Sequence, residues 1–368
     1  MTSTIVTDPT AANPLDLLSL GRLGADDQRV AALYWEQFTN RRALVVRHAS
    51  TGTQGTVNLP VDSLDGWYGA VLALRGDDVW VLGGGGPLVL RHYRLSGSPL
   101  PTSATLVSRR ALGDSDSRVG DVVALADGRL AVVWHQHGST GPQGMAVGFA
   151  TTAGGWSQLT GLQFMPTRAS KQSAAQHPAD GTLWIFNNPD GWGRVGLARI
   201  SVAGSTPSVL STEGTFLDPA VHGDNAPDPE NPDLVAVTDA ATTTVALAYQ
   251  SKVRLRFSTT ILGSQPVVAR FTANRSAQFV RLAEWVERVS NLGLAANAQG
   301  TWLTYRPVDA QTLRFDQLQL RRLDAAGWSA AAVLGTLADA HARIGSGGQR
   351  AEVVARMSDG TLRLFSAR

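Results

Sequence analysis

The chain has 368 residues, of which 43% are apolar and 17% charged, and its formal net charge at pH 7 is +2. The apolar fraction excludes a disordered chain, the low share of charge argues against a helical bundle, and the near-neutral balance gives no reason to expect a nucleic-acid partner. Because the chain has no cysteine, disulfides, thiolate nucleophiles and cysteine-ligated zinc are excluded. The 38 glycines and 17 prolines favour a protein with many turns and short strands.

The start of the chain, residues 1–14, has neither a basic segment nor a long apolar stretch, which predicts that there is no signal peptide. No stretch approaches the ~18 consecutive apolar residues that a membrane-spanning helix needs. We therefore expect no membrane insertion, and a cytoplasmic or virion-associated location.

A short phrase recurs along the chain: Asp-Gly, one further residue, Leu, and then an apolar run. It stands at 127–134, 180–186 and 359–365, and weaker versions begin near residues 27, 77, 243 and 299. Asp-Gly between two apolar runs predicts a tight hairpin turn, because both residues tolerate a positive φ. The copies are about 50 to 60 residues apart, a spacing typical of propeller blades with several strands each.

The turn in each copy is expected to join the first strand of a unit to the second. Third strands are predicted in chain order at 43–48, 88–93, 145–150, 195–200, 253–257 and 313–318. Fourth strands are predicted at 105–108, 159–164 and 267–271. Trp80, Trp184 and Trp302 occupy matching places in the repeat, so we expect them to pack between blades.

These units predict an all-β protein, a single seven-bladed β-propeller of four-stranded antiparallel blades that occupies residues 1–368. The blades are expected at 14–60, 64–110, 116–165, 170–213, 232–273, 289–336 and 348–368. The last unit has only two predicted strands, so an N-terminal strand within residues 3–8 is expected to complete that blade and cover its edge.

The segment 278–290 does not fit the strand pattern as clearly. Phe279, Leu282, Val286 and Val289 recur at helical spacing, with Trp285 beside them. The segment is either a short helix or a strand, and the spacing favours the helix slightly.

Two of the turns expected between third and fourth strands carry a Gly-Trp pair, in Thr151–Ser157 and in Leu323–Ser329. The pair is what remains here of the Asp box, Ser-x-Asp-x-Gly-x-Thr-Trp. In layout the whole chain resembles the sialidase-like (BNR or Asp-box type) seven-bladed propellers, although few motif residues match. The resemblance implies the fold. It says little about activity, because one fold hosts many functions. The Arg-Ile-Pro motif of sialidases is absent, and the similar Tyr305-Arg306-Pro307 stands in the sixth unit.

The strand order also predicts which residues meet. In a propeller, the loops between blades and between second and third strands share one face, and the Asp-Gly turns lie on the other. Histidines, aromatics, arginines and acids gather in the first set of loops, so we predict that this loop face binds the ligand. Its residues are Trp67, Tyr68, Asp114, Asp116, His135, His137, Arg168, Asn187, Asn188, Asp190, Trp192, His222, Asp224, Asn225, Tyr305 and Arg306.

Several motifs on this face have both a functional interpretation and an ordinary structural one. His135 and His137 have the spacing of a metal or sugar-binding edge, but no third ligand stands nearby, and solvated loop histidines are the plainer interpretation. Asp114, Asp116 and Asp224 could offer hard oxygen ligands to Ca²⁺, or could belong to ordinary turns. No other cofactor is expected. The segment 187–192 combines amides with an aromatic ring, which suits a glycan contact.

Two classes of function follow. The favoured hypothesis is a non-catalytic recognition or assembly module whose loop face binds a glycan or a protein, as on a virion, a phage tail or a cell surface. The alternative is a glycoside hydrolase or polysaccharide lyase acting at the same face, with His135, His137, His177, Tyr305 and Arg306 as candidate catalytic residues. A lyase would need a His or Tyr base and an Arg to neutralise a uronate carboxylate. An intracellular protein scaffold is a third hypothesis, and the sequence does not predict an oligomeric state.

Overall fold

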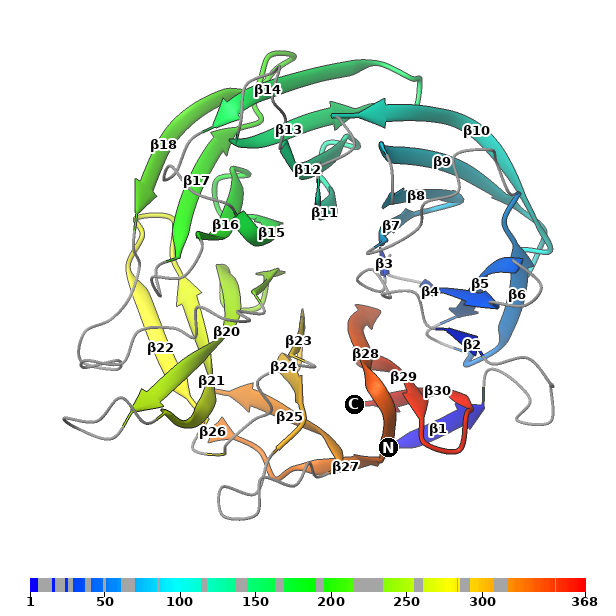
Figure 1. The fold of residues 1–368 in the computed structure, drawn as a ribbon, viewed down its shortest axis with the longest axis vertical. Helices are drawn as coiled ribbons and strands as arrows, with labels where there is room; N and C mark the ends of the chain where they lie inside the picture. Colours follow the sequence, from blue (N-terminus) through cyan, green and yellow to red (C-terminus); the bar gives the residue numbers. More distant parts are fainter. Residues whose placement is uncertain are drawn as a thin grey trace. The chain divides into compact units, whose positions relative to one another are not determined.

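The structure is a computed structural model of the whole chain, drawn in Figure 1. It describes residues 1–5, 15–16, 24–25, 29–36, 41–48, 51–60, 70–84, 87–113, 118–136, 144–162, 169–189, 195–214, 234–254, 261–282, 284, 292–307, 317–347 and 349–368. These residues form strands and turns and no helix. The strands make seven antiparallel sheets with the four-stranded pattern of propeller blades, so the predicted fold class is confirmed. The chain divides into two compact units, residues 1–161 with 337–368, and residues 162–336.

The first unit contains four blades. Blade 1 has β2 (Leu15–Asp16) and β3 (Gly24–Ala25), which both pair with β4 (Arg29–Glu36), followed by β5 (Arg41–His48) and β6 (Gln54–Asn58). Blade 2 has β7 (Val71–Arg75), β8 (Asp78–Gly83), β9 (Leu88–Ser96) and β10 (Ser103–Leu112). Blade 3 has β11 (Arg118–Ala124), β12 (Leu130–Gln136), β13 (Gly144–Ala150) and β14 (Trp156–Leu162). Blade 7 has β28 (Leu337–Gly347), β29 (Arg350–Met357), β30 (Leu362–Ala367) and β1 (Thr2–Ile5).

The second unit contains three blades. Blade 4 has β15 (Ala169–Gln176), β16 (Leu183–Pro189), β17 (Gly196–Ser201) and β18 (Ser208–Gly214). Blade 5 has β19 (Val235–Asp239), β20 (Thr244–Arg254), β21 (Ile261–Phe271) and β22 (Ala277–Arg281). Blade 6 has β23 (Gly293–Asn297), β24 (Gly300–Tyr305), β25 (Leu318–Asp324), β26 (Gly327–Trp328) and β27 (Ala332–Gly335), the last two pairing with β25 in turn.

Burial explains why the second strands read as unbroken apolar runs. Blade 2 packs against blade 1 on one side and against blade 3 on the other, so both faces of its inner strands are covered, and five consecutive residues of β8 are buried. The outer strand β10 is largely exposed along its length. Trp80, Trp184 and Trp302 are all buried, in agreement with the packing role predicted for them.

The Asp-Gly phrase forms the expected tight turn. The Asp127 Oδ1 atom accepts the Arg129 backbone N–H at 2.9 Å, and Asp180 and Asp359 accept the N–H two residues on in the same way. The following glycines have positive φ, for example 95° at Gly128. The weak copy in blade 5 has no glycine there, and its Thr243 adopts a φ of 55°, a conformation that disfavours a β-branched residue.

The N-terminal strand completes blade 7, as predicted. Strand β1 pairs antiparallel with β30, from Thr2 opposite Ser366 to Ile5 opposite Arg363, and Figure 1 shows β1 along the edge of this sheet. However, the C-terminal part supplies three strands and not two. Strand β28 contacts β3 of blade 1, just as β3 contacts β7 and β7 contacts β11, so β28 is the innermost strand of its blade. Blade 7 therefore begins at Leu337 rather than at residue 348.

This arrangement corrects the interpretation of the last Asp-Gly phrase. Asp359-Gly360 joins β29 to β30, the second and third strands, whereas Asp127-Gly128 joins the first strand to the second. The phrase encodes local turn chemistry that suits any tight hairpin. It therefore identifies a hairpin without saying which hairpin of the blade it is.

Blade 5 brings two further corrections. Residues 267–271 belong to the third strand, β21, and the fourth strand is β22. The helix favoured for 278–290 is wrong for Gln278–Arg281, which lie in β22, with Phe279 opposite Ala269. Phe279 packs on the blade 4–5 core and Val280 on the blade 5–6 core, so β22 buries apolar residues on both faces and loses the alternation expected of a strand. Residues 285–290 lie outside the described residues.

Candidate functional site

Most residues predicted for the loop face lie outside the described residues. These are Trp67, Tyr68, Asp114, Asp116, His137, Arg168, Asp190, Trp192, His222, Asp224 and Asn225. All three Ca²⁺ candidates are among them, so calcium binding stays a prediction. Within the described ranges, no group of three or more His, Cys, Asp or Glu side chains could hold a metal ion.

The remaining residues of the predicted face lie at one kind of position. His135 is near the end of β12, Asn187 and Asn188 are near the end of β16, and Tyr305 ends β24, with Arg306 directly after it. Each of these strands is the second of its blade, so its end is opposite the turn that joins it to the first strand. We call this the loop end of a blade, and the opposite end the turn end.

At the loop end of blade 4, two carboxamides lie opposite each other. Gln172 of β15 is the register partner of Asn187 of β16, and their exposed fractions are only 8% and 6%. Both polar atoms of the Gln172 amide, and Oδ1 of Asn187, have no hydrogen-bond partner among the described residues. A buried polar group without a partner costs roughly 1–3 kcal/mol, so such groups in a folded protein usually meet water or a ligand.

Other polar side chains of β15 do have hydrogen-bond partners. One residue further along β15, the Ser173 hydroxyl accepts the Ala236 backbone N–H at 2.8 Å and so ties blade 4 to blade 5. At the far end of β15, the Gln176 amide donates to the Gly181 carbonyl at 2.9 Å. Gln172 and Asn187 thus differ from these polar neighbours in that buried amide atoms of both have no hydrogen-bond partner among the described residues.

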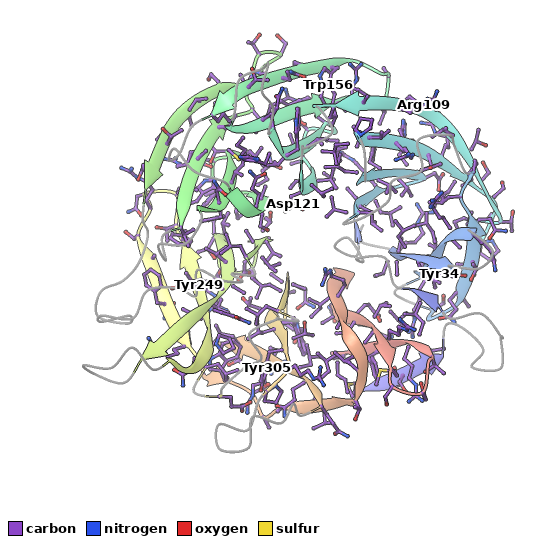
Figure 2. The ribbon with its side chains drawn as sticks, in the orientation of Figure 1. Tyr34, Arg109, Asp121, Trp156, Tyr249 and Tyr305 are labelled. Atoms are coloured by element: carbon purple, nitrogen blue, oxygen red, sulfur yellow. The ribbon has the colours of Figure 1, made fainter. Side chains whose placement is uncertain are left out.

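Tyr305 is held in a polar cluster at the loop end of blade 6. Its hydroxyl lies 2.6 Å from Glu284 Oε2 and 2.8 Å from Gln319 Oε1, and it accepts a hydrogen bond from Arg321 Nε at 2.8 Å. Arg321 also pairs with Glu284. The ring of Tyr305 is fully buried against Leu294 and the rest of the blade 5–6 core (Figure 2).

This environment works against proton abstraction by Tyr305. Burial, followed by the hydrogen bond to Glu284, raises the pKa of the Tyr305 phenol well above its ordinary value. The phenol therefore stays protonated at neutral pH, whereas a catalytic base is most effective with a pKa near the working pH.

His177, another of the candidate catalytic residues, lies at the turn end of blade 4. It is fully buried; its Nδ1 accepts the Ala179 backbone N–H at 3.1 Å, and its Nε2 lies 3.2 Å from the Phe271 carbonyl oxygen. Both ring nitrogens are thus used within the fold, and the ring packs 5.2 Å from that of Trp184.

A separate hollow lies between blades 2 and 3 of the first unit. It has a volume of about 80 Å³. Its floor includes Trp80, Leu90 and His92, and its other walls are formed by Ser108–Arg110 of β10 and by Ala150–Trp156 around the turn between β13 and β14. Figure 2 labels Arg109 and Trp156 on the outer strands of these two blades. We call this the blade 2–3 hollow.

The turn on this hollow is one of the two that carry the Gly-Trp pair. The Thr151 hydroxyl accepts the Gly155 backbone N–H at 2.9 Å, and Gly154 has a φ of 87°. Trp156 lies so close over Gly148 that a Cβ there would come within 2.1 Å of its ring. Both Gly-Trp turns join third and fourth strands, where the resemblance to Asp-box propellers placed them.

Sequence reasoning did not single out Gln172, Glu284, Arg321 or His92. Arg321 meets Tyr305 through the pairing of β24 with β25, and Glu284, which lies before β23, meets it only in the folded chain. No spacing along the chain reveals either contact. The adjacent arginines Arg109 and Arg110 offered a visible signal, because two cations on an outer strand need not both serve packing.

The chain was also compared with known proteins. No protein-family model matches it, and no curated protein matches it in sequence. Among solved structures, it is similar to the polysaccharide lyase Uly1, with a TM-score of 0.58 and 11% identity over 96% of this chain and 91% of that one. It is also similar to an oligogalacturonate lyase in complex with manganese, with a TM-score of 0.56 and 11% identity over 98% and 92% of the two chains.

At this level of identity the similarity concerns the fold alone. The chain is a seven-bladed β-propeller of the architecture found in these lyases. The comparison gives no sequence support for the sialidase branch in particular. No helix that is both long and apolar enough to cross a membrane occurs in the described parts of the chain.

Proposed function

We propose that this protein is a non-catalytic recognition propeller that binds a glycan at the loop end of blade 4. The observation that carries the proposal is the Gln172–Asn187 pair, two buried carboxamides in which both polar atoms of Gln172 and Oδ1 of Asn187 have no hydrogen-bond partner among the described residues. A carboxamide donates and accepts at the same time, as does a sugar hydroxyl, so such a pair suits a ligand rich in hydroxyl groups. Its hydrogen bonding does not depend on pH, in contrast to a catalytic acid or base.

Two of the candidate catalytic residues, Tyr305 and His177, also favour binding over catalysis. Tyr305 is a poor base because its pKa is raised, and both nitrogens of His177 are engaged in the fold. Since both similar structures are lyases, a lyase reaction at the same face is the alternative to be tested, and uronate-containing polysaccharides belong among the probes.

The test combines a binding and a turnover measurement on one panel of neutral and uronate-containing oligosaccharides. We expect saturable binding by calorimetry or on a glycan array, with no release of reducing ends or unsaturated uronates. Gln172→Ala and Asn187→Ala should each weaken binding by about 3- to 10-fold, the effect of one or two lost hydrogen bonds.

The matched control is Gln278→Ala, which removes an exposed carboxamide from β22 of the same unit and should leave the affinity unchanged. Turnover of any polysaccharide by the intact chain, abolished in Tyr305→Phe, would overturn the non-catalytic proposal. Unchanged glycan affinity in both blade 4 variants would show that the glycan does not bind at this position.

A further inference from the structure

The outermost strand of blade 2 has features that the glycan proposal does not use. Strand β10 pairs with β9 on one side, and Figure 1 shows it along the rim of its sheet. It has 10 residues, whereas no outermost strand of another blade is longer than 7 residues within the described parts of the chain. We call the side of β10 that faces away from β9 the β10 edge.

The β10 edge offers backbone hydrogen-bonding groups. In an antiparallel strand, alternate residues direct their N–H and C=O groups to one neighbouring strand, and the residues between them direct theirs to the other side. The pairing of β10 with β9 has a bulge between Leu106 and Ser108 and then runs without interruption over Ser108–Leu112. On the outer side of this run, no strand of the described residues pairs with β10. All residues of the run except Leu112 are exposed, so an extended chain can reach these backbone groups.

Two arginines flank the β10 edge, one on each face of the sheet. Arg110 is the register partner of Leu90, which packs in the core between blades 2 and 3, so Arg110 lies on the blade 3 side. Arg109 is the partner of Arg91 and therefore lies on the opposite face, toward blade 1. Both arginines are exposed, and neither guanidinium forms a hydrogen bond or an ion pair with a described residue. Each charge is therefore available to a partner.

The side chains beside the edge add a fixed cation and an apolar contact. The guanidinium carbon of Arg110 lies 4.8 Å from the centre of the Trp156 ring, so a cation–π contact holds this side chain in place. A stacked guanidinium keeps its N–H donors at its rim, where they can bind a carboxylate. Val107, in the bulge, is 48% exposed and offers apolar surface next to the run.

The backbone groups of the β10 edge decide the class of the partner. An extended polypeptide presents donors and acceptors at the repeat of a β-strand, so the edge favours a protein segment over a glycan. A second copy of this chain fits poorly, because pairing of β10 with β10 of another copy brings Arg109 and Arg110 of both copies against each other, and like charges across a strand pair are unfavourable. Acidic side chains at the same positions are attracted instead.

We propose that the β10 edge binds a protein partner, which adds an extended acidic segment to blade 2 as a further strand. The backbone of the segment pairs with Ser108–Leu112. Two consecutive acidic residues of the segment face Arg109 and Arg110 on the two faces of the sheet, because neighbouring residues of a strand alternate in direction. The site belongs to the first unit and takes a protein, so it goes beyond the glycan proposed for the second unit.

The experiment uses the full chain and a fluorescein-labelled peptide, Thr-Val-Glu-Glu-Val-Thr, in anisotropy titrations at low salt. A second peptide has the same sequence with N-methyl groups on both glutamate nitrogens, which keeps the charge and blocks strand pairing along both edges of the peptide. We expect the first peptide to bind at least about tenfold more tightly than the second, since backbone hydrogen bonds supply much of the affinity in strand addition. Added salt should weaken the binding.

Charge reversal locates the site. Arg109→Glu and Arg110→Glu should each weaken binding of the acidic peptide by about tenfold, because an attraction becomes a repulsion. The double variant should instead bind a peptide with lysines in place of the glutamates. Both residues are exposed, so the thermal midpoint should stay unchanged. The matched control is Arg368→Glu, which reverses an exposed charge of the same unit and should leave the affinity near that of the parent.

Four results would overturn the proposal. Equal affinity for the two peptides would show attraction by charge alone, and an equal loss in Arg368→Glu would show that overall charge, and not the β10 edge, is responsible. Absence of binding by the acidic peptide would remove the site. Self-association of the parent chain in sedimentation, abolished in Val107→Glu, would assign the edge to a second copy. Because Gln172→Ala and Asn187→Ala leave β10 intact, failure of the glycan proposal can be told apart from failure of this one.

Discussion

At the scale of single residues, glycines are required at particular positions, either by close packing or by the backbone conformation. Gly148 is the clearest case, because the Trp156 ring occupies the space where any side chain would begin. Its backbone conformation is ordinary for a strand, so the requirement for glycine here comes from packing and not from φ. By contrast, Gly154 and Gly360 have positive φ with open space around them, and for these residues the backbone sets the requirement.

We predict that Gly148→Ala lowers the free energy of unfolding by about 1–3 kcal/mol, the usual cost of forcing atoms into a packed core. The displaced Trp156 ring should also lose its contact with Arg110, which tryptophan fluorescence would report. Gly55→Ala in β6 is the control, since a Cβ there would meet its nearest neighbour at 3.6 Å, an ordinary contact. Equal urea midpoints for the two variants would contradict this account.

At the scale of strands and blades, polar contacts join neighbouring sheets, and one of these contacts includes a buried acid. Glu352 of β29 is fully buried; its Oε1 accepts the Ser366 hydroxyl at 2.6 Å, and Oε2 is 3.8 Å from the nearest Arg47 nitrogen on β5. Burial raises the pKa of Glu352 even though Ser366 and Arg47 act in the opposite direction. Relative to the protonated acid, the ionised carboxylate of Glu352 is therefore less stable in the folded chain than in the unfolded chain.

The sign of the pH effect follows from this raised pKa. The folded chain binds the Glu352 proton more tightly than the unfolded chain, so this residue makes the fold less stable as the pH rises from the unfolded pKa through the higher folded one. Glu352→Gln imitates the protonated acid at every pH. It should raise the thermal midpoint relative to the parent at pH 7 to 8, and the gain should vanish near pH 4.

Glu213→Gln is the control for this pH series, because Glu213 forms an ion pair with Arg275 on the exposed side of the second unit. That substitution should change the midpoint little at any pH, as is usual for surface pairs. A loss of stability in Glu352→Gln at pH 8 would mean that attraction to Arg47 outweighs burial.

At the scale of the whole molecule, the two ends of the chain share one sheet. Strand β1 covers the edge of β30, which would otherwise offer unpaired backbone groups for association with other chains. Blade 7 is thus held by three strands from the C-terminal part and one from the N-terminal part.

Removal of residues 1–5 should expose this edge. We expect a thermal midpoint several degrees lower and concentration-dependent self-association in sedimentation, both because the paired edge is lost. Removal of Met1 alone, which lies outside β1, is the control and should behave like the parent chain. An unchanged midpoint and a monodisperse sample after removal of residues 1–5 would show that β1 does not stabilise blade 7.

Much of the architecture could be predicted because propeller blades repeat. The Asp-Gly turns, the apolar second strands and the N-terminal closing strand all follow from local rules. The errors have a common cause: at Asp359-Gly360 and at Phe279, the local pattern was identified, but its place within the blade was not. That place depends on which strand is innermost, and only contacts between blades decide it, such as that of β28 with β3.

The candidate site was less predictable for the same reason. The sequence placed Asn187 and Tyr305 at loop ends, but it could not show that Asn187 faces Gln172 or that Tyr305 meets Glu284, 21 residues earlier, and Arg321, 16 residues later. The sequence by itself determined the number of blades, their turns and the residues at strand ends, because these depend on neighbours along the chain. Only the tertiary structure decided which polar groups are buried without partners, because burial and pairing arise when strands distant in sequence pack together.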